Sequence, residues 1–168
     1  MARCLIVANQ TLGGRALEAS VRDCISREIT GFYVVVPRTR VRDESTSWTG
    51  GFRVDDGMTL DQARAFREGL LRNYEAALDE ERRRAQDRLD QMIEKIAAAG
   101  GQATGEVGVD DPLEATRWAL GRQGPFDEII VSTLPARISR WVRLDIPHRI
   151  ARLTDVPVTT VEAAAEPG

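Results

Sequence analysis

The chain has 168 residues, of which 42% are apolar and 29% are charged, with a formal net charge of -3. This length fits one domain with a substantial core, and we expect that domain to span residues 1–168. The balanced charge argues against a nucleic-acid partner and a membrane partner, and no apolar run approaches the roughly 20 residues of a membrane span.

Cysteine and histidine usage argues against a metal site. The two cysteines, Cys4 and Cys24, lack ligand spacing, and His148 is the single histidine, so a two-histidine motif is not possible. We interpret both cysteines as buried, reduced thiols. The chain also enters structure too soon for a signal peptide, so we expect a cytoplasmic protein.

The first part of the chain predicts a strand, a helix and a second strand. Cys4–Ala8 is a continuous apolar run, as in strands that are buried on both faces. After a turn, residues 15–25 have the apolar spacing of a helix. Residues 29–36 are rich in β-branched and aromatic side chains and end at Pro37, which predicts the second strand.

Residues 37–58 predict a long inserted loop, because they are polar and rich in turn residues. A loop of this length inside a compact domain is usually functional or mobile. Its two isolated aromatic residues, Trp48 and Phe52, either anchor a partner or cover the domain's own core. We interpret the acidic pair Asp55–Asp56 as part of a turn rather than as a metal site.

The longest predicted element is a helix that begins at Thr59 and ends at the Gly100–Gly101 pair. Thr59 and Gln62 fit a capping box, and the two glycines are a stop signal. An unbroken helix of about 40 residues would be ~60 Å long, which is more than a small sheet is deep. Either the helix breaks near Gly69, or its N-terminal half projects and packs on something else. The charged run at residues 79–84 should be solvated.

The rest of the chain predicts three more strands with helices between them. In order, these elements are a strand at 103–109, a helix capped by Asp111, a strand at 128–132, a helix capped by Asp145, a strand at 157–161 and a frayed tail at 162–168. Strands that alternate with helices at these spacings predict a doubly wound α/β fold with a five-stranded parallel sheet.

An open sheet of this kind binds ligands outside the carboxyl ends of its strands, against a helix N-terminus. The stretch after the fourth strand contains Arg137, Arg140 and Arg143, whose spacing places them on one side of a helical turn. Guanidinium groups suit phosphate and carboxylate, which favours an anion site. The alternatives are a solvated basic face and pairing of these arginines with Asp145 and the acidic surface.

The same stretch offers little that points to catalysis. His148 could act as a pH switch or a general base, although a lone histidine in the first turn of a helix is more often structural. No serine or cysteine has the setting of a nucleophile elbow, so we assign no catalytic residue. Trp141 either anchors a partner or covers the core.

Four segments add sequence detail to this order of elements. They are Leu5–Asn9, Val109–Ala115, Asp127–Ser132 and Asp145–Val158. In the order of its elements and in these four segments, the chain resembles the universal stress protein family. The resemblance covers nearly the whole length of the chain. The resemblance implies a Rossmann-like fold of the adenine-nucleotide alpha-hydrolase type. It also implies a homodimer, often through the last strand, where residues 156–161 would form an edge that invites antiparallel pairing.

The chain departs from the ATP-binding members of that family at the residues that define the site. They carry an acidic residue where Asn9 stands, and glycines where Ser132, Pro135 and Leu144 stand. Glycine lets the backbone approach phosphate closely, whereas Pro135 lacks an N–H donor. Asp145 would place a carboxylate where a phosphate binds. We therefore expect a divergent member that lacks the glycine-rich signature.

Two functions from different classes remain open. The first is a non-catalytic, metal-free, stress- or signal-related protein that acts by homodimerisation and partner binding, without tight ATP binding and without a resident cofactor. The alternative is a protein that binds ATP, AMP or another phosphate ligand through the arginine-rich loop. Its candidate ligand-binding residues are Ala8, Asn9, Val36, Ser132, Thr133, Arg137, Arg140, Arg143, Asp145 and His148. A slow nucleotide hydrolase has only fold analogy behind it.

Overall fold

The computed structural model describes residues 2–12, 14–39, 57 and 59–163. The chain divides into two compact units, a sheet unit (Met1–Arg38 and Arg84–Gly168) and a second unit (Thr39–Arg83). Most of the predicted inserted loop lies outside the described residues, including Trp48, Phe52 and the Asp55–Asp56 pair. The end of the predicted tail, residues 164–168, also lies outside them.

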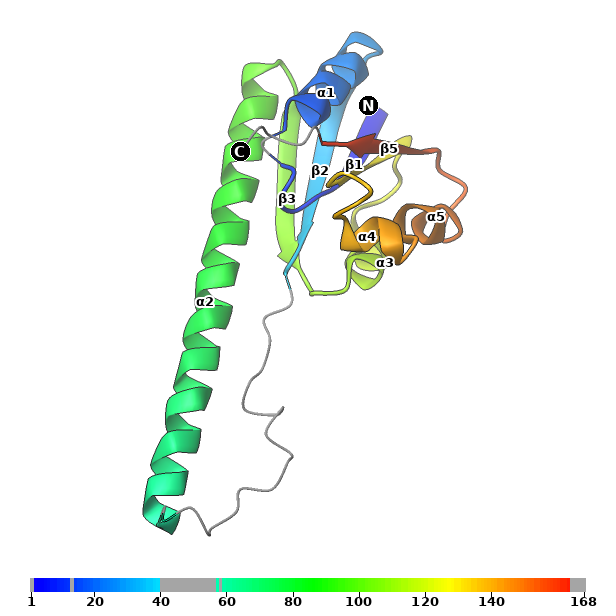
Figure 1. Ribbon diagram of the computed structural model, residues 1–168. Helices are drawn as coiled ribbons and strands as arrows, with labels where there is room; N and C mark the ends of the chain where they lie inside the picture. Colours follow the sequence, from blue (N-terminus) through cyan, green and yellow to red (C-terminus); the bar gives the residue numbers. More distant parts are fainter. Residues whose placement is uncertain (1, 13, 40–56, 58, 164–168) are drawn as a thin grey trace. The chain divides into compact units, whose positions relative to one another are not determined.

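The sheet unit contains five parallel strands, as the sequence predicts. They are β1 (Ala2–Val7), β2 (Ile29–Pro37), β3 (Gln102–Gly108), β4 (Glu128–Thr133) and β5 (Val158–Glu162). Their order across the sheet is β3-β2-β1-β4-β5 (Figure 1). The chain winds outward from β1 in one direction and then returns to start β4 on its other side. This reversal beside β1 is the topological switch point of a doubly wound fold.

Burial explains why the strands differ in sequence. The central strands β2 and β4 are almost continuously buried, and β1 is buried from Cys4 to Val7. Strands covered on both faces read as unbroken apolar runs, so the sequence pattern identifies them directly. The edge strand β3 instead alternates between exposed and half-buried residues. β5, at the other edge, is exposed at Thr159, Thr160 and Glu162.

Helices cover both faces of the sheet (Figure 1). One face packs against α1 (Arg15–Ser26) and the C-terminal part of α2 (Leu60–Ala98). The other face packs against α3 (Pro112–Gln123) and α5 (Ile146–Ala151). The short α4 (Arg140–Arg143) lies between β4 and α5 in the chain and contacts α5. Alternate residues of β1 supply the two core layers, with Cys4 and Ile6 in the first and Leu5 and Val7 in the second.

The helix α2 is unbroken over 39 residues, so the predicted alternative of a break near Gly69 is wrong. The capping box is confirmed, since Thr59 N donates to Gln62 Oε1 at 2.9 Å and Gln62 N donates to Thr59 Oγ1 at 3.2 Å. Gly100 ends the helix with a φ of 101°. Its buried side chains are Ala85, Leu89, Met92 and Ile96, all in the C-terminal part. Within the described residues, no helix has the length and apolar character needed to cross a membrane.

The helix predicted from Asp145 differs from the observed structure. Asp111 caps α3 as expected, by accepting from Leu113 N and Glu114 N. Asp145 makes no such side-chain cap for α5, so that part of the prediction is wrong. The physical reason is an additional turn: Asp145 N donates to Val142 O, which ends α4. Asp145 therefore adopts a left-handed conformation with a φ of 55°, as residues that end helices often do.

The edge strand β3 contains a glycine where no side chain fits. A Cβ atom at Gly105 would lie 2.3 Å from Val34 O and 2.6 Å from Leu89 Cδ1. We predict that Gly105→Ala lowers the free energy of unfolding by about 1–3 kcal/mol, because the strand or α2 must move. Urea denaturation at equilibrium measures this change.

The matched control is Gly121→Ala in α3, where a Cβ would meet nothing within 4 Å. We expect this variant to raise the free energy of unfolding by up to about 1 kcal/mol, because alanine favours a helix over glycine. Equal effects of the two substitutions would contradict the packing of α2 on β3.

Candidate functional site

The carboxyl edge of the sheet brings together the predicted residues at the ends of β1, β2 and β4. Val7 is paired with Val35 on one side and with Val131 on the other. The next residues along each strand therefore lie side by side, and these are Ala8, Val36 and Ser132. All are buried, and Ala8 N donates to Val35 O at 3.2 Å. This edge is the switch point, where the fold places a ligand site.

Asn9 joins three elements at this edge. Its Nδ2 donates to Pro37 O, at the end of β2, over 2.6 Å. Its Oδ1 accepts from Arg88 Nη1, on α2, over 2.7 Å. Asn9 is only 8% exposed, so its amide is held by the protein at both ends. The resemblance would place a carboxylate at this position. The neutral Asn9 side chain instead holds the end of β1 through these two hydrogen bonds.

Arg88 is a residue of this site that the sequence reasoning missed. It is half-buried, and it belongs to the face of α2 that packs on the sheet. A signal for it exists in the helical spacing, because Arg88 lies three residues after buried Ala85 and four before buried Met92. A charged residue inside an apolar helical face usually has a polar partner.

The end of β4 is enclosed by two neighbouring segments. Thr11 Oγ1 donates to Ser132 O at 3.2 Å, and Ala163 N donates to Thr133 O at 2.8 Å. Ser132 is 2% exposed, and its Oγ is a buried polar atom without a hydrogen-bond partner among the described residues. Such atoms are uncommon in folded proteins. The serine at the first glycine position therefore gives this edge an unused donor and acceptor.

The loop after β4 turns at Pro135 and leads into α4. Ser139 N donates to Pro135 O at 2.9 Å, and Ser139 Oγ accepts from Val142 N at 3.2 Å. Ser139 is therefore the N-cap of α4, and it is 3% exposed. The sequence reasoning missed this cap, although a serine before a short helical turn is its usual signal.

The segment from the loop after β4 to the end of α5 carries five exposed arginines. We refer to this set as the basic face, namely Arg137, Arg140, Arg143, Arg149 and Arg152. Within the described part of the chain, no carboxylate forms an ion pair with any of them. The predicted pairing with Asp145 is therefore not seen there. Toward the residues that the structure describes, these five side chains donate one hydrogen bond, from Arg143 Nη2 to Arg137 O at 3.3 Å.

Asp145 and His148 contact each other on the surface. The distance from His148 Nδ1 to Asp145 Oδ1 is 3.9 Å, and both side chains are more than 60% exposed, at 67% and 63%. A contact of this length in water contributes little to stability. Trp141, by contrast, is half-buried and packs against the second core layer, which matches the core-covering alternative.

Neither cysteine lies at this edge. Cys4 and Cys24 are free and buried, as expected from the sequence. Among the residues that the structure describes, no group of three or more His, Cys, Asp or Glu side chains could hold a metal ion.

Comparison with known proteins identifies the fold. No family model matches the sequence, and no curated protein matches it either. Solved structures do match. A universal stress protein family protein from Arabidopsis thaliana with AMP bound gives a TM-score of 0.56 at 11% identity, over 99% of this chain and 94% of that chain. A member of the family from Burkholderia pseudomallei gives 0.55 at 14% identity, over 95% and 94%.

A universal stress protein in complex with cAMP gives a TM-score of 0.54 at 14% identity, over 97% of this chain and 98% of that chain. The chain therefore has the universal stress protein fold, which confirms the fold implied by the resemblance in sequence. At these identities the match shows the fold alone, so any function of the site must be argued from the residues of this chain.

The hydrogen bonds of the Asn9 side chain can be tested by their contribution to stability. We predict that Asn9→Ala lowers the free energy of unfolding by about 2 kcal/mol, because the buried Pro37 carbonyl loses its donor and Arg88 loses an acceptor. The control is Asn73→Ala on the exposed surface of α2, with an expected change within about 0.5 kcal/mol. If both variants unfold at the same urea concentration, Asn9 does not hold the edge together.

Proposed function

We propose that this chain is a non-catalytic binding protein that holds a phosphate-bearing ligand of the adenine mononucleotide class at the carboxyl edge of β1 and β4. The observation that carries the proposal is the basic face: five exposed arginines, unpaired with carboxylates in the described part of the chain, on the segments that follow β4. Three of them, Arg137, Arg140 and Arg143, belong to the loop and short helix that begin at the switch point.

Local charge supports an anionic ligand. Residues 137–152 contain five arginines and one aspartate, although the whole chain carries a net charge of -3. A concentrated positive patch on an otherwise acidic protein attracts anions and raises their local concentration. Arginine also offers paired N–H donors that match phosphate oxygens, so side chains can supply what glycine amides supply elsewhere.

The fold supports the adenine mononucleotide class. Two of the similar structures contain AMP and cAMP. In this chain Ala8, Asn9 and Val36 would lie near the base, and Ser132 and Thr133 would lie between the base and the arginines. The unpartnered Ser132 Oγ could then bind a ligand hydroxyl or phosphate oxygen. Asp145 and His148 border the phosphate region, where the exposed Asp145 carboxylate would oppose a high charge such as that of ATP.

Titration calorimetry with adenosine, AMP, cAMP, ATP and inorganic phosphate tests this proposal. We expect saturable binding of AMP that is stronger than that of adenosine and weakens as salt is added. Arg140→Ala should reduce the affinity for AMP by about tenfold or more, because it removes a charge-assisted hydrogen bond. The matched control is Arg117→Ala on α3, where the arginine already contacts Glu114 at 3.6 Å.

Two results would contradict the proposal. The first is the absence of saturable binding for every compound in the panel. The second is equal affinity for adenosine and AMP, with Arg140→Ala indistinguishable from Arg117→Ala, because the basic face would then have no part in recognition.

A second observation favours homodimerisation, through which the stress- or signal-related role implied by the resemblance would act. β5 pairs with β4 on one side and forms one edge of the sheet. Ile129 N donates to Pro157 O, and Ala163 N donates to Thr133 O, so the odd-numbered residues of this segment face β4. The backbone of Thr160 therefore points outward, where a second β5 could pair with it.

This arrangement predicts a specific effect of proline. Thr160→Pro removes an outward N–H and leaves the bonds to β4 intact, so it should convert a dimer into a folded monomer. Thr160→Val keeps the N–H and should remain dimeric. Light scattering with size exclusion measures the mass of each variant. A wild-type protein that is monomeric at high concentration would refute pairing through β5.

A further inference from the structure

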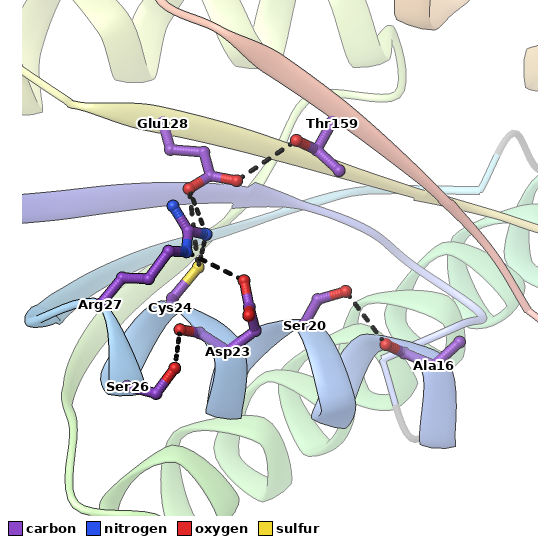
Figure 2. Close-up of polar contacts among 8 residues, drawn as sticks. All are labelled: Ala16, Ser20, Asp23, Cys24, Ser26, Arg27, Glu128 and Thr159. Carbon is purple, nitrogen blue, oxygen red and sulfur yellow. Dashed lines mark hydrogen bonds and ion pairs between the residues drawn. The ribbon is translucent and has the colours of Figure 1, made fainter.

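A cluster of polar side chains extends from the core to the surface at the amino end of the sheet, the opposite end from the candidate ligand site. Its centre is Glu128, the first residue of β4, which is 9% exposed. Arg27 Nη2 donates to Glu128 Oε2 at 2.8 Å, and Thr159 Oγ1 donates to Glu128 Oε1 at 3.2 Å (Figure 2). Arg27 is itself oriented by Asp23, with 2.9 Å between Arg27 Nε and Asp23 Oδ2.

Both cysteines of the chain belong to this cluster. Cys24, on α1, lies between the two charges: its Sγ donates to Glu128 Oε2 at 3.8 Å and accepts from Arg27 Nη2 at 3.5 Å (Figure 2). Cys4, on β1, is the direct neighbour of Glu128 in the sheet register. Both thiols are fully buried and belong to the same core cluster. Two thiols, a carboxylate and a guanidinium thus meet in one place.

We propose that Cys4 and Cys24 form a dithiol site that a small hydroperoxide oxidises to an intramolecular disulfide, with Cys24 as the attacking thiol and Cys4 as the resolving thiol. This inference is independent of the nucleotide proposal, because the two sites lie at opposite ends of the strands. It uses buried nucleophiles that ligand binding at the carboxyl edge does not involve.

The environment distinguishes the two sulfurs. Arg27 Nη2 donates to Cys24 Sγ at 3.5 Å, and a positively charged donor beside a sulfur stabilises its thiolate. The neighbouring Cys4 thiol and Arg27 lower the pKa of Cys24, whereas burial and the Glu128 carboxylate act to raise it. The neighbouring Cys24 thiol and burial raise the pKa of Cys4. Since the thiolate is the nucleophile, we assign Cys24 as the attacking sulfur.

The reaction balances with a hydroperoxide as the oxidant. The Cys24 sulfur attacks the terminal peroxide oxygen while its proton passes to Glu128, and the O–O bond breaks. The leaving oxygen takes that proton, giving water or an alcohol, and Cys24 becomes a sulfenic acid. The Cys4 sulfur then attacks Cys24, the S–O bond breaks, and the leaving hydroxide takes the Cys4 proton to form water. The dithiol loses two electrons, and the peroxide gains them.

Access favours a small oxidant. Cys4 and Cys24 are both 0% exposed, so a bulky reagent cannot reach them in the folded state. The Arg27 side chain contacts Cys24 and is 47% exposed, so it extends from the buried thiol to the solvent. We therefore take movement of the Arg27 side chain as the route by which a molecule of the size of hydrogen peroxide would reach Cys24.

Mass spectrometry of the full chain tests the site. The reduced protein is treated with hydrogen peroxide, quenched with catalase, unfolded and alkylated with iodoacetamide. We expect the wild-type chain to lose the mass of two hydrogen atoms and to take up no alkyl group, with peptide mapping that links Cys4 to Cys24. In Cys4→Ser we expect dimedone to trap a sulfenic acid on Cys24. In Cys24→Ser we expect Cys4 to stay a thiol.

Two arginines of α1 provide a matched pair. Arg27→Gln should slow oxidation by about tenfold, the effect of raising the pKa of the attacking thiol by about one unit. Arg22→Gln, on the exposed surface of the same helix, should leave the rate unchanged. Full alkylation of both thiols after peroxide treatment of wild type, a disulfide between chains, or equal rates in the two arginine variants would overturn the proposal. The wild-type mapping decides the central point even if a cysteine variant fails to fold.

Discussion

The coverage of β1 on both faces is the constraint on which the rest of the structure depends. β1 lies between β2 and β4, and its residues from Cys4 to Ala8 are all buried. An unpaired polar group in the middle of such a strand would be costly, so polar contacts gather at its two ends. At the carboxyl end, Asn9 binds Pro37 and Arg88. At the amino end, Cys4 adjoins Glu128, which binds Arg27.

The fold could be predicted from local patterns, because each strand and helix is determined mainly by residues that are close together in the sequence. The apolar run at Cys4–Ala8 and the capping residues Thr59 and Gln62 are examples. The polar contacts at both ends of β1 could not be predicted in the same way. Asn9 and Arg88 are 79 residues apart, and Arg27 and Glu128 are 101 apart. Only the assembled sheet shows that such distant side chains meet.

The ends of the helices near the candidate site were the least predictable part of the fold. Asp145 was interpreted as a helix cap because aspartate is common there, yet its backbone ends α4 in a left-handed conformation. The basic face was visible in the sequence, whereas its lack of carboxylate partners in the described residues came from the structure. Anion binding through arginines instead of backbone amides would have a cost in entropy, because long side chains lose more conformational freedom than a rigid loop does on binding.

The uneven burial of α2 has a consequence for how the sequence can vary. Its buried residues lie between Ala85 and Ile96, while residues 60–83 contribute exposed or half-buried side chains joined by surface pairs such as Glu80–Arg83, at 3.5 Å. Pairs of this kind contribute only about 0.2–0.5 kcal/mol each, and they can be rebuilt at any helical position. Substitutions at the exposed positions of residues 60–83 should therefore change stability little, whereas substitutions at Ala85, Leu89, Met92 and Ile96 alter the packing of the core.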